Sequence, residues 1–338
     1  MIMTVNKLKK QLAVLLCLAG LGFGVHAADY RLDPTKVKGP DACGECHEDS
    51  VSAWKLSHHS TTFKNLPRSD EARSIADKMG IKRIKSESDC LGCHFTVAES
   101  DGGTKPIAGI SCESCHGAGA DWIDVHSDFG GKDVKAEDED PAHKVQRYAD
   151  AEAAGMIRPS NLYALAENCY SCHTVPNEKL VNTGGHVAGS NFELVRWTQG
   201  EVRHNLWYSK DNNEASLERR RMLYVVGKLL DLEYALRGVA RATEKADYAV
   251  SMAKRAKKAT AFVKKISELV DAPELNEVLA VAGSVKLKLN NEAALIEAAD
   301  KMAGISKKFA SNYDGSALSG VDELLPTPDK YKGDAYVN

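Results

Sequence analysis

The amino-acid sequence predicts an all-α protein in two parts, a loop-rich N-terminal part followed by an antiparallel helical bundle. All nine cysteines lie within the first 172 of the 338 residues, and all eleven histidines lie within the first 204. After residue 212, apolar residues recur at alternating spacings of three and four, which is typical of packed helices. The net charge of -3 and the ordinary glycine and proline content exclude a basic nucleic-acid-binding protein and a low-complexity chain.

Residues 1–27 have the pattern of a secretory signal peptide. Lys7, Lys9 and Lys10 precede an apolar run, and Val25-His26-Ala27 resembles a cleavage site that would leave Ala28 as the first mature residue. The run is about 14 residues long, whereas a helix that spans a bilayer needs about 20. An uncleaved membrane anchor is the alternative. The sequence therefore predicts export to the periplasm.

Every cysteine of the predicted mature chain belongs to one of four Cys-x-x-Cys-His motifs. Four disulfides or zinc sites would also use eight cysteines, but neither explains a histidine directly after the second cysteine four times. A c-type haem does, because two thiols attach the ring and the adjacent histidine binds its iron. The sequence thus predicts four covalently attached haem c groups, held by Cys43, Cys46 and His47; Cys90, Cys93 and His94; Cys112, Cys115 and His116; and Cys169, Cys172 and His173.

Six other histidines of the mature chain could supply the second axial ligands. A haem iron with two histidine ligands suits electron transfer, whereas an open position permits substrate binding. Counting alone cannot decide between these states, because six candidates face four positions. The candidates are His58, His59, His126, His143, His186 and His204.

The motif-bearing part resembles the tetrahaem cytochrome c-554 family over roughly residues 40–210. The resemblance rests on three spacings in addition to the motifs themselves. Trp54 precedes His59 by five residues, Gly117-Ala-Gly119 follows the third motif, and His126 lies ten residues beyond His116. Proteins of this family serve in ammonia oxidation and share a haem arrangement with hydroxylamine oxidoreductase and multihaem nitrite reductases.

The resemblance implies a set of distal ligands. It gives His126 to the first haem, His59 to the third and His204 to the fourth, and it leaves the second haem five-coordinate on His94. His186 departs from the family pattern and could cap either the second or the fourth haem. His58 and His143 remain unassigned.

We expect residues 28–212 to form the haem-binding part. Porphyrin faces would fill the volume that side chains occupy in other domains, so little conventional core is needed. Segments after the motifs, such as 48–63, are predicted to be short helices that deliver ligands, with loops between them and little sheet. The acidic run at 137–140 predicts a solvated loop.

Residues 213–312 are predicted to form a bundle of four amphipathic helices, and residues 313–338 a C-terminal tail. The resemblance does not cover this part, which could dimerise, dock on a partner or cover a haem edge. If the bundle is a separate module, deletion of residues 213–338 leaves the haem spectra intact. The apolar seams run through 222–239, 246–270, 275–289 and 295–309.

Together these features predict a periplasmic tetrahaem c-type cytochrome that transfers electrons between redox partners of a respiratory chain. Its donor would be a quinol-linked protein or dehydrogenase, its acceptor a terminal reductase or oxidase, and it would meet the membrane only through a partner. One alternative is a redox enzyme that acts on a small nitrogen or sulfur species, such as nitric oxide or hydroxylamine, at an open second haem. No acid–base pair near the motifs supports catalysis. A second alternative is an electron-transfer subunit docked to a larger complex through the bundle.

Overall fold

The computed structural model describes residues 31–86 and 88–337. The predicted signal peptide lies outside these residues. The described chain is mainly helical and contains one two-stranded antiparallel sheet, as the sequence predicts. Within these ranges no helix is both long and apolar enough to cross a bilayer.

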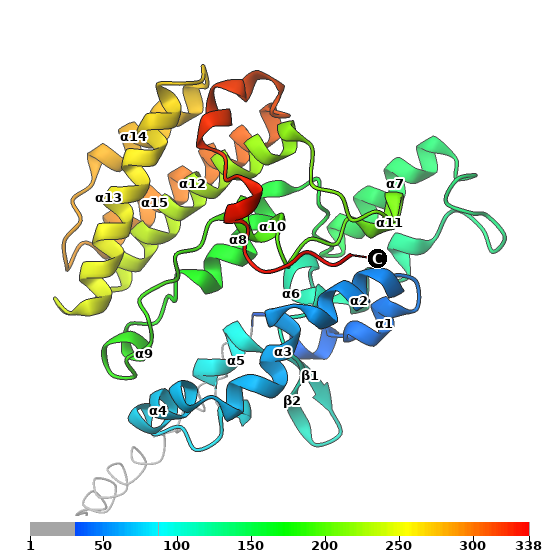
Figure 1. The fold of residues 1–338 in the computed structure, drawn as a ribbon, viewed down its shortest axis with the longest axis horizontal. Coiled ribbons are helices and arrows are strands. Elements are labelled where there is room, and N and C mark those ends of the chain that lie inside the picture. The colour runs from blue at the N-terminus through cyan, green and yellow to red at the C-terminus, as the bar shows by residue number, and fades with distance from the viewer. Residues whose placement is uncertain (1–30, 87, 338) are drawn as a thin grey trace, which may run out of the picture.

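The N-terminal part consists of short helices joined by loops, with one hairpin after the second motif (Figure 1). Strands β1 (Thr96–Ser100) and β2 (Gly103–Ala108) form the hairpin. Only one small apolar cluster, built around Leu91, Phe95 and Val97, belongs to this part alone in the described chain. The helices are α1 (Pro40–Gly44), α2 (Glu48–Leu56), α3 (His58–Asn65), α4 (Asp70–Met79), α5 (Ser88–His94), α6 (Cys112–His116), α7 (Pro141–Ala153), α8 (Leu162–His173), α9 (Glu178–Asn182), α10 (Leu194–Thr198) and α11 (Leu206–Ser209).

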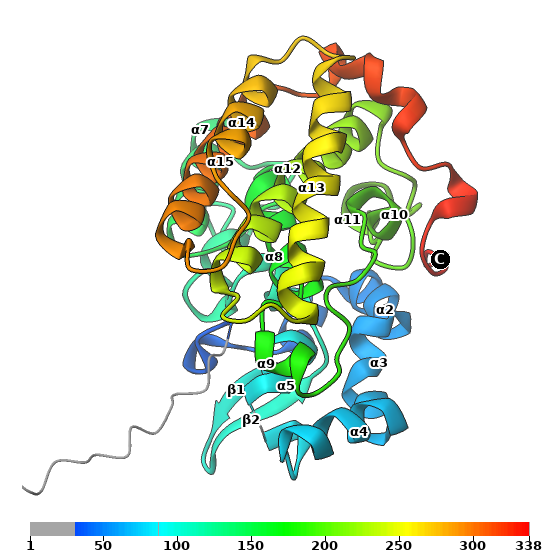
Figure 2. The ribbon, with the colours of Figure 1, turned by 90° about the vertical axis from the view of Figure 1, so that its left-hand side faces the viewer.

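The C-terminal part is the predicted helical bundle (Figure 2). Its helices are α12 (Leu217–Arg241), α13 (Asp247–Ser267), α14 (Pro273–Ser284) and α15 (Glu292–Asn312). Helix α12 packs against both α13 and α15, and α14 closes the other side of the bundle. Most seam residues are buried as the spacing predicts, with Leu229, Val263, Leu295 and Phe309 at most 1 % exposed. The third seam was predicted to run through residue 289, but α14 ends at Ser284 and the chain becomes extended there.

Helix α8 belongs to the bundle core although it carries the fourth motif. Leu162, Tyr163, Ala166 and Tyr170 are 1–3 % exposed and lie in the same apolar cluster as α12, α13 and α15. The Tyr163 hydroxyl donates a hydrogen bond of 2.6 Å to Glu233 on α12. The change of composition near residue 212 therefore does not coincide with a break in the core.

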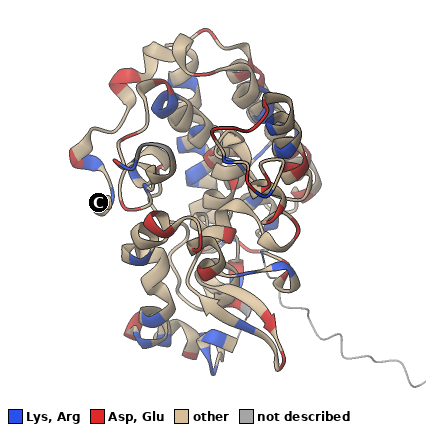
Figure 3. Ribbon diagram, turned by 90° about the vertical axis from the view of Figure 1, so that its right-hand side faces the viewer, with Lys and Arg blue, Asp and Glu red and all other residues tan. Residues whose placement is uncertain are grey.

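The C-terminal tail crosses back onto the N-terminal part. Its backbone forms two hydrogen bonds of 2.9 Å, from Lys332 to the carbonyl of Arg196 and from Glu201 to the carbonyl of Lys332. Arg221 on α12 pairs with Asp322 at 2.6 Å, which ties the tail to the bundle as well. Basic and acidic residues are interspersed over both parts, in keeping with the small net charge (Figure 3).

Candidate metal centres

No disulfide joins any of the eight cysteines of the four motifs. The second, third and fourth motifs form the last turns of α5, α6 and α8, and the first spans the end of α1. Residues three apart in a helical turn share one face, so a motif of this spacing presents both thiols on the same side. The histidine follows at the end of the turn. This is the arrangement that attachment of one ring through two sulfur atoms requires.

Each motif histidine faces a second histidine from a distant segment. The ring centroids are 6.3 Å apart for His47 and His126, and 6.4 Å apart for His94 and His186. They are also 6.3 Å apart in the pairs formed by His116 with His204 and by His173 with His59.

The shared ring separation fits a single metal ion between each pair. A first-row metal binds an imidazole nitrogen at about 2 Å. In a five-membered ring with bonds of about 1.35 Å, the centroid lies about 1.1 Å behind that nitrogen. Two rings that bind one ion from opposite sides therefore have centroids a little over 6 Å apart, as all four pairs do.

Hydrogen bonds at Nδ1 favour the tautomer in which Nε2 is free to bind iron. In five of the eight paired histidines, Nδ1 lies within 3.0 Å of an oxygen atom that can accept its proton. A ligand histidine held in this way keeps a fixed ring orientation and becomes more basic. The contacts are those of His116 with Ile157 O, His126 with Ile123 O, His173 with Ser190 Oγ, His186 with Val187 O and His204 with Val202 O.

Burial favours the neutral imidazole, which is the form that binds a metal. Desolvation is the largest cause that lowers the pKa of both His94 and His173 to about 4. It also lowers the pKa of His59 and His116. These side chains are therefore ready to coordinate at neutral pH.

The two remaining described histidines pair with carboxylates instead. His58 Nδ1 lies 2.6 Å from Glu201 Oε2, and His143 Nδ1 lies 2.8 Å from Glu139 Oε1. Glu139 also accepts two hydrogen bonds from Arg147, and these are the largest cause that lowers the pKa of Glu139 to about 2. The prediction of a wholly solvated acidic run is thus wrong at Glu139, which is buried.

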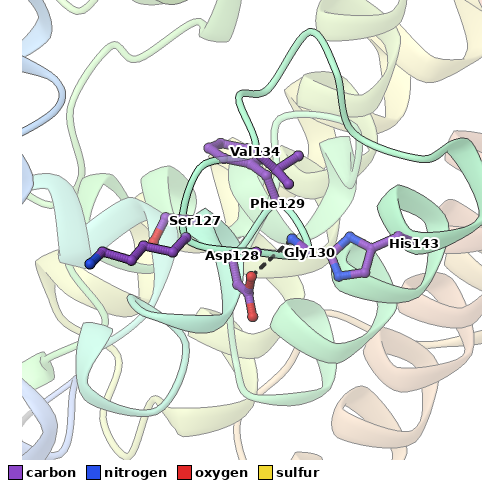
Figure 4. Close-up of a pocket in the computed structure, with 8 residues that line it drawn as sticks. Ser127, Asp128, Phe129, Gly130, Val134 and His143 are labelled. Carbon is purple, nitrogen blue, oxygen red and sulfur yellow. Dashed lines mark hydrogen bonds between the residues drawn. The ribbon is translucent and has the colours of Figure 1, made fainter.

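His143 also lines an open hollow formed with the 127–134 loop (Figure 4). In the described part of the chain, no three His, Cys, Asp or Glu side chains converge to hold a metal ion. A metal at the paired histidines would therefore need further ligands from outside the chain, such as the four nitrogens of a porphyrin.

Comparison with known proteins agrees with this arrangement. Residues 42–117 match the family described as cytochrome c554 and c-prime. Over these residues, the chain is similar to the cytochrome c-554 family. It is 26% identical over 144 residues to cytochrome c-554 of Nitrosomonas europaea, a match that covers 40% of this chain and 57% of that protein. The match thus spans little more than half of that relative, and no solved structure matches the chain. Similarity to the cytochrome c-554 family implies covalently bound haem c.

The observed ring pairs differ from the ligand assignment that the resemblance implied. His126 faces His47 as expected, but His59 faces the fourth motif rather than the third, and His204 faces the third rather than the fourth. His186, which could have capped either the second or the fourth haem, lies opposite His94 of the second motif. Chain spacing could not reveal these pairs, because they depend on which distant segments pack together.

The backbone of His59 is anchored to the segment that precedes the third motif. The Trp54 indole donates a 2.7 Å hydrogen bond to the carbonyl of Ile110, and the Ile110 amide donates to the carbonyl of His59 at 3.1 Å. Gly109 packs so closely that an added Cβ would overlap this same carbonyl. The five-residue spacing from Trp54 to His59 thus positions α3 against residues 109–110.

Replacement of Gly109 by alanine is expected to displace His59. The added methyl group forces the two segments apart, and overpacking of this kind costs about 1–3 kcal/mol. The holoprotein should lose the low-spin absorption of one haem in four and unfold at a lower temperature. Gly102→Ala is the matched control, because nothing lies within 4 Å of its added Cβ. Equal spectra for the two variants would contradict this role of Gly109.

Glu113, inside the third motif, joins that motif to the segment before the first. Its buried carboxylate accepts hydrogen bonds from the amides of Lys38 at 2.9 Å, Gly39 at 2.8 Å and Gly119 at 2.7 Å. These amides lead into α1 on one side and toward His126 on the other. A single side chain therefore fixes two segments that surround the first motif.

Replacement of Glu113 by alanine is expected to loosen the first motif. Three backbone donors lose their acceptor, and each buried unsatisfied group costs about 1–3 kcal/mol. Thermal unfolding of the holoprotein should shift clearly downward. Glu45→Ala provides the control, since Glu45 is exposed inside the first motif. A melting temperature for Glu113→Ala equal to that of the control would refute this prediction.

Proposed function

We propose that this protein is a periplasmic tetrahaem cytochrome c that carries electrons between redox partner proteins. The observation that carries the proposal is the second histidine opposite every motif histidine. Iron with two histidine ligands has no open position, so it exchanges electrons without binding a substrate. The pair of His94 and His186 supports the proposal most directly, because an open second haem was the main argument for an enzyme.

The proposed haem sites use residues of this chain only. Two cysteines of each motif would hold a ring, and the motif histidine and the facing histidine would bind its iron. When bound, haem c supplies reversible one-electron chemistry at its iron. The protein fixes the ligands through the Nδ1 hydrogen bonds and keeps the imidazoles neutral by burial.

Contacts among the thiols support electron movement between neighbouring haems. The Cys43 side chain lies beside that of Cys112, and the Cys93 side chain beside that of Cys172. Asn168 on α8 donates a 3.0 Å hydrogen bond to the carbonyl of Cys115, which joins the third motif to the fourth. Because the sulfur atoms would hold the ring edges, we infer a succession of first, third, fourth and second haem.

The proposal is tested on the purified holoprotein. Pyridine haemochrome analysis counts covalent haems, and electron paramagnetic resonance of the oxidised protein counts irons with an open position. We expect four haems per chain and only low-spin ferric signals. Fewer than four haems would overturn the tetrahaem assignment. A stoichiometric high-spin signal, together with cyanide or nitric oxide binding without ligand displacement, would instead favour the enzyme.

Periplasmic location rests on the signal peptide pattern. Expression in a bacterial host with haem-attachment machinery should give a periplasmic product that begins at Ala28. The mass of the intact holoprotein checks this directly. A product that retains residues 1–27 and sediments with membranes would support the anchor instead.

A further inference from the structure

His173 of the fourth motif is supported by side chains on two sides. The Ser190 hydroxyl lies 3.0 Å from His173 Nδ1, and the Ser190 amide donates a 2.8 Å hydrogen bond to the carbonyl of His173. The ring of Phe192 stacks on the imidazole at a centroid distance of 4.4 Å and an angle of 22°. In the other four paired histidines with such a contact, the Nδ1 partner is a backbone carbonyl.

The bundle holds the segment that carries Ser190. Arg255 on α13 donates a hydrogen bond from Nη1 to the carbonyl of Ser190 at 3.1 Å. Its Nε donates to Asp231 on α12 at 2.5 Å, and both side chains are less than one-fifth exposed. Gly189 has a φ of +81° and passes so close that an added Cβ would lie 2.7 Å from Arg255 Nη1. The contacts therefore run from two bundle helices to the imidazole of His173.

We propose that Arg255 is a positioning residue through which the C-terminal bundle sets the axial ligation of the fourth haem. The inference rests on the proposed function, since it requires a haem at His173. Asp231 orients the guanidinium, the guanidinium fixes the Ser190 backbone, and the Ser190 hydroxyl then accepts the Nδ1 proton of His173. A hydrogen-bonded imidazole is a more basic ligand and favours ferric iron. The bundle thus lowers the reduction potential of this haem.

The test is a redox titration of the intact holoprotein and two variants. Ser190→Ala removes the hydroxyl, and Arg255→Lys keeps the positive charge but loses the two-pronged contact. In each variant, the reduction potential of one of the four haems should rise by up to 59 mV, which corresponds to a tenfold change in a one-electron equilibrium. The double variant should raise that potential no further than Ser190→Ala does, because both substitutions break the same series of contacts from the bundle to His173.

Two controls separate this role from general loosening of the fold. Ser284→Ala and Arg241→Lys make the same chemical changes at exposed positions of the bundle and should leave all four steps in place. The g-values of one low-spin signal should shift in the Ser190 and Arg255 variants, which a purely structural role would not produce.

The result that would overturn the inference is an Arg255→Lys titration identical to that of the unaltered protein. A uniform shift of all four steps, or additive shifts in the double variant, would also overturn it. These outcomes differ from failure of the proposed function, which would show first as fewer than four covalent haems or as a high-spin iron in the unaltered protein.

Discussion

Replacement of His186 by alanine is expected to change one of four low-spin irons into a high-spin iron. His186 follows α9 in a glycine-rich loop, and its ring lies 6.4 Å from that of His94. Without it, the second haem would keep His94 as its sole protein ligand and expose the opposite side. The oxidised variant should show a high-spin ferric signal that accounts for one haem per chain, and it should bind cyanide at that site.

His143→Ala is the matched control for this experiment. His143 pairs with Glu139 and does not face a motif histidine, so its loss should leave every iron low-spin. Retention of a fully low-spin spectrum in His186→Ala would mean that another group binds the second iron. In that case the ring pair of His94 and His186 has a different purpose.

Deletion of residues 213–338 is expected to destroy the fourth haem site. Leu162, Tyr163 and Tyr170 on α8 are 1–3 % exposed, and the helices that cover them would be missing. Burial of each large apolar side chain contributes about 1.5–3 kcal/mol, against a total stability of about 5–15 kcal/mol for a domain. The truncated chain should aggregate or lose the native low-spin signal of the fourth haem, as electron paramagnetic resonance would reveal.

If the bundle were a separate module, the same deletion would leave the haem spectra intact. Point substitutions in the complete chain keep the test interpretable. Leu229→Ala removes a fully buried side chain of α12 and should lower stability by about 2–5 kcal/mol. Val250→Ala, at a position 38% exposed, should have little effect. A truncated protein that is soluble, with four haems and native spectra, would show that α8 does not need the bundle.

The sequence was sufficient for local features and insufficient for long-range ones. The motifs could be predicted because cysteine and histidine spacing is local, and α12 to α15 because seam periodicity is local. The partner of His59 could not, since it depends on the backbone contact between His59 and Ile110, far apart in the chain. Glu139 was misjudged because its acidic neighbours suggested solvent, while Arg147, eight residues later, buries its carboxylate.

Helix α8 shows a signal that sequence interpretation overlooked. Its apolar residues at 162, 163, 166 and 170 have helical spacing, which is typical of a helix that packs against another helix. The fourth motif at its end drew attention to haem instead. Both functions share the helix, because its apolar face packs on the bundle while its last turn carries the cysteines.

Because α8 belongs to the bundle core and also carries the fourth motif, the steps by which the protein assembles must follow an order. Cys169 packs against the bundle core, so the closed bundle restricts approach to this thiol. Covalent attachment of haem needs accessible thiols. A chain delivered from its N-terminus presents the fourth motif before residues 217–312 have arrived, which leaves an interval in which Cys169 is uncovered. We therefore expect haem attachment at the fourth motif to precede closure of the bundle.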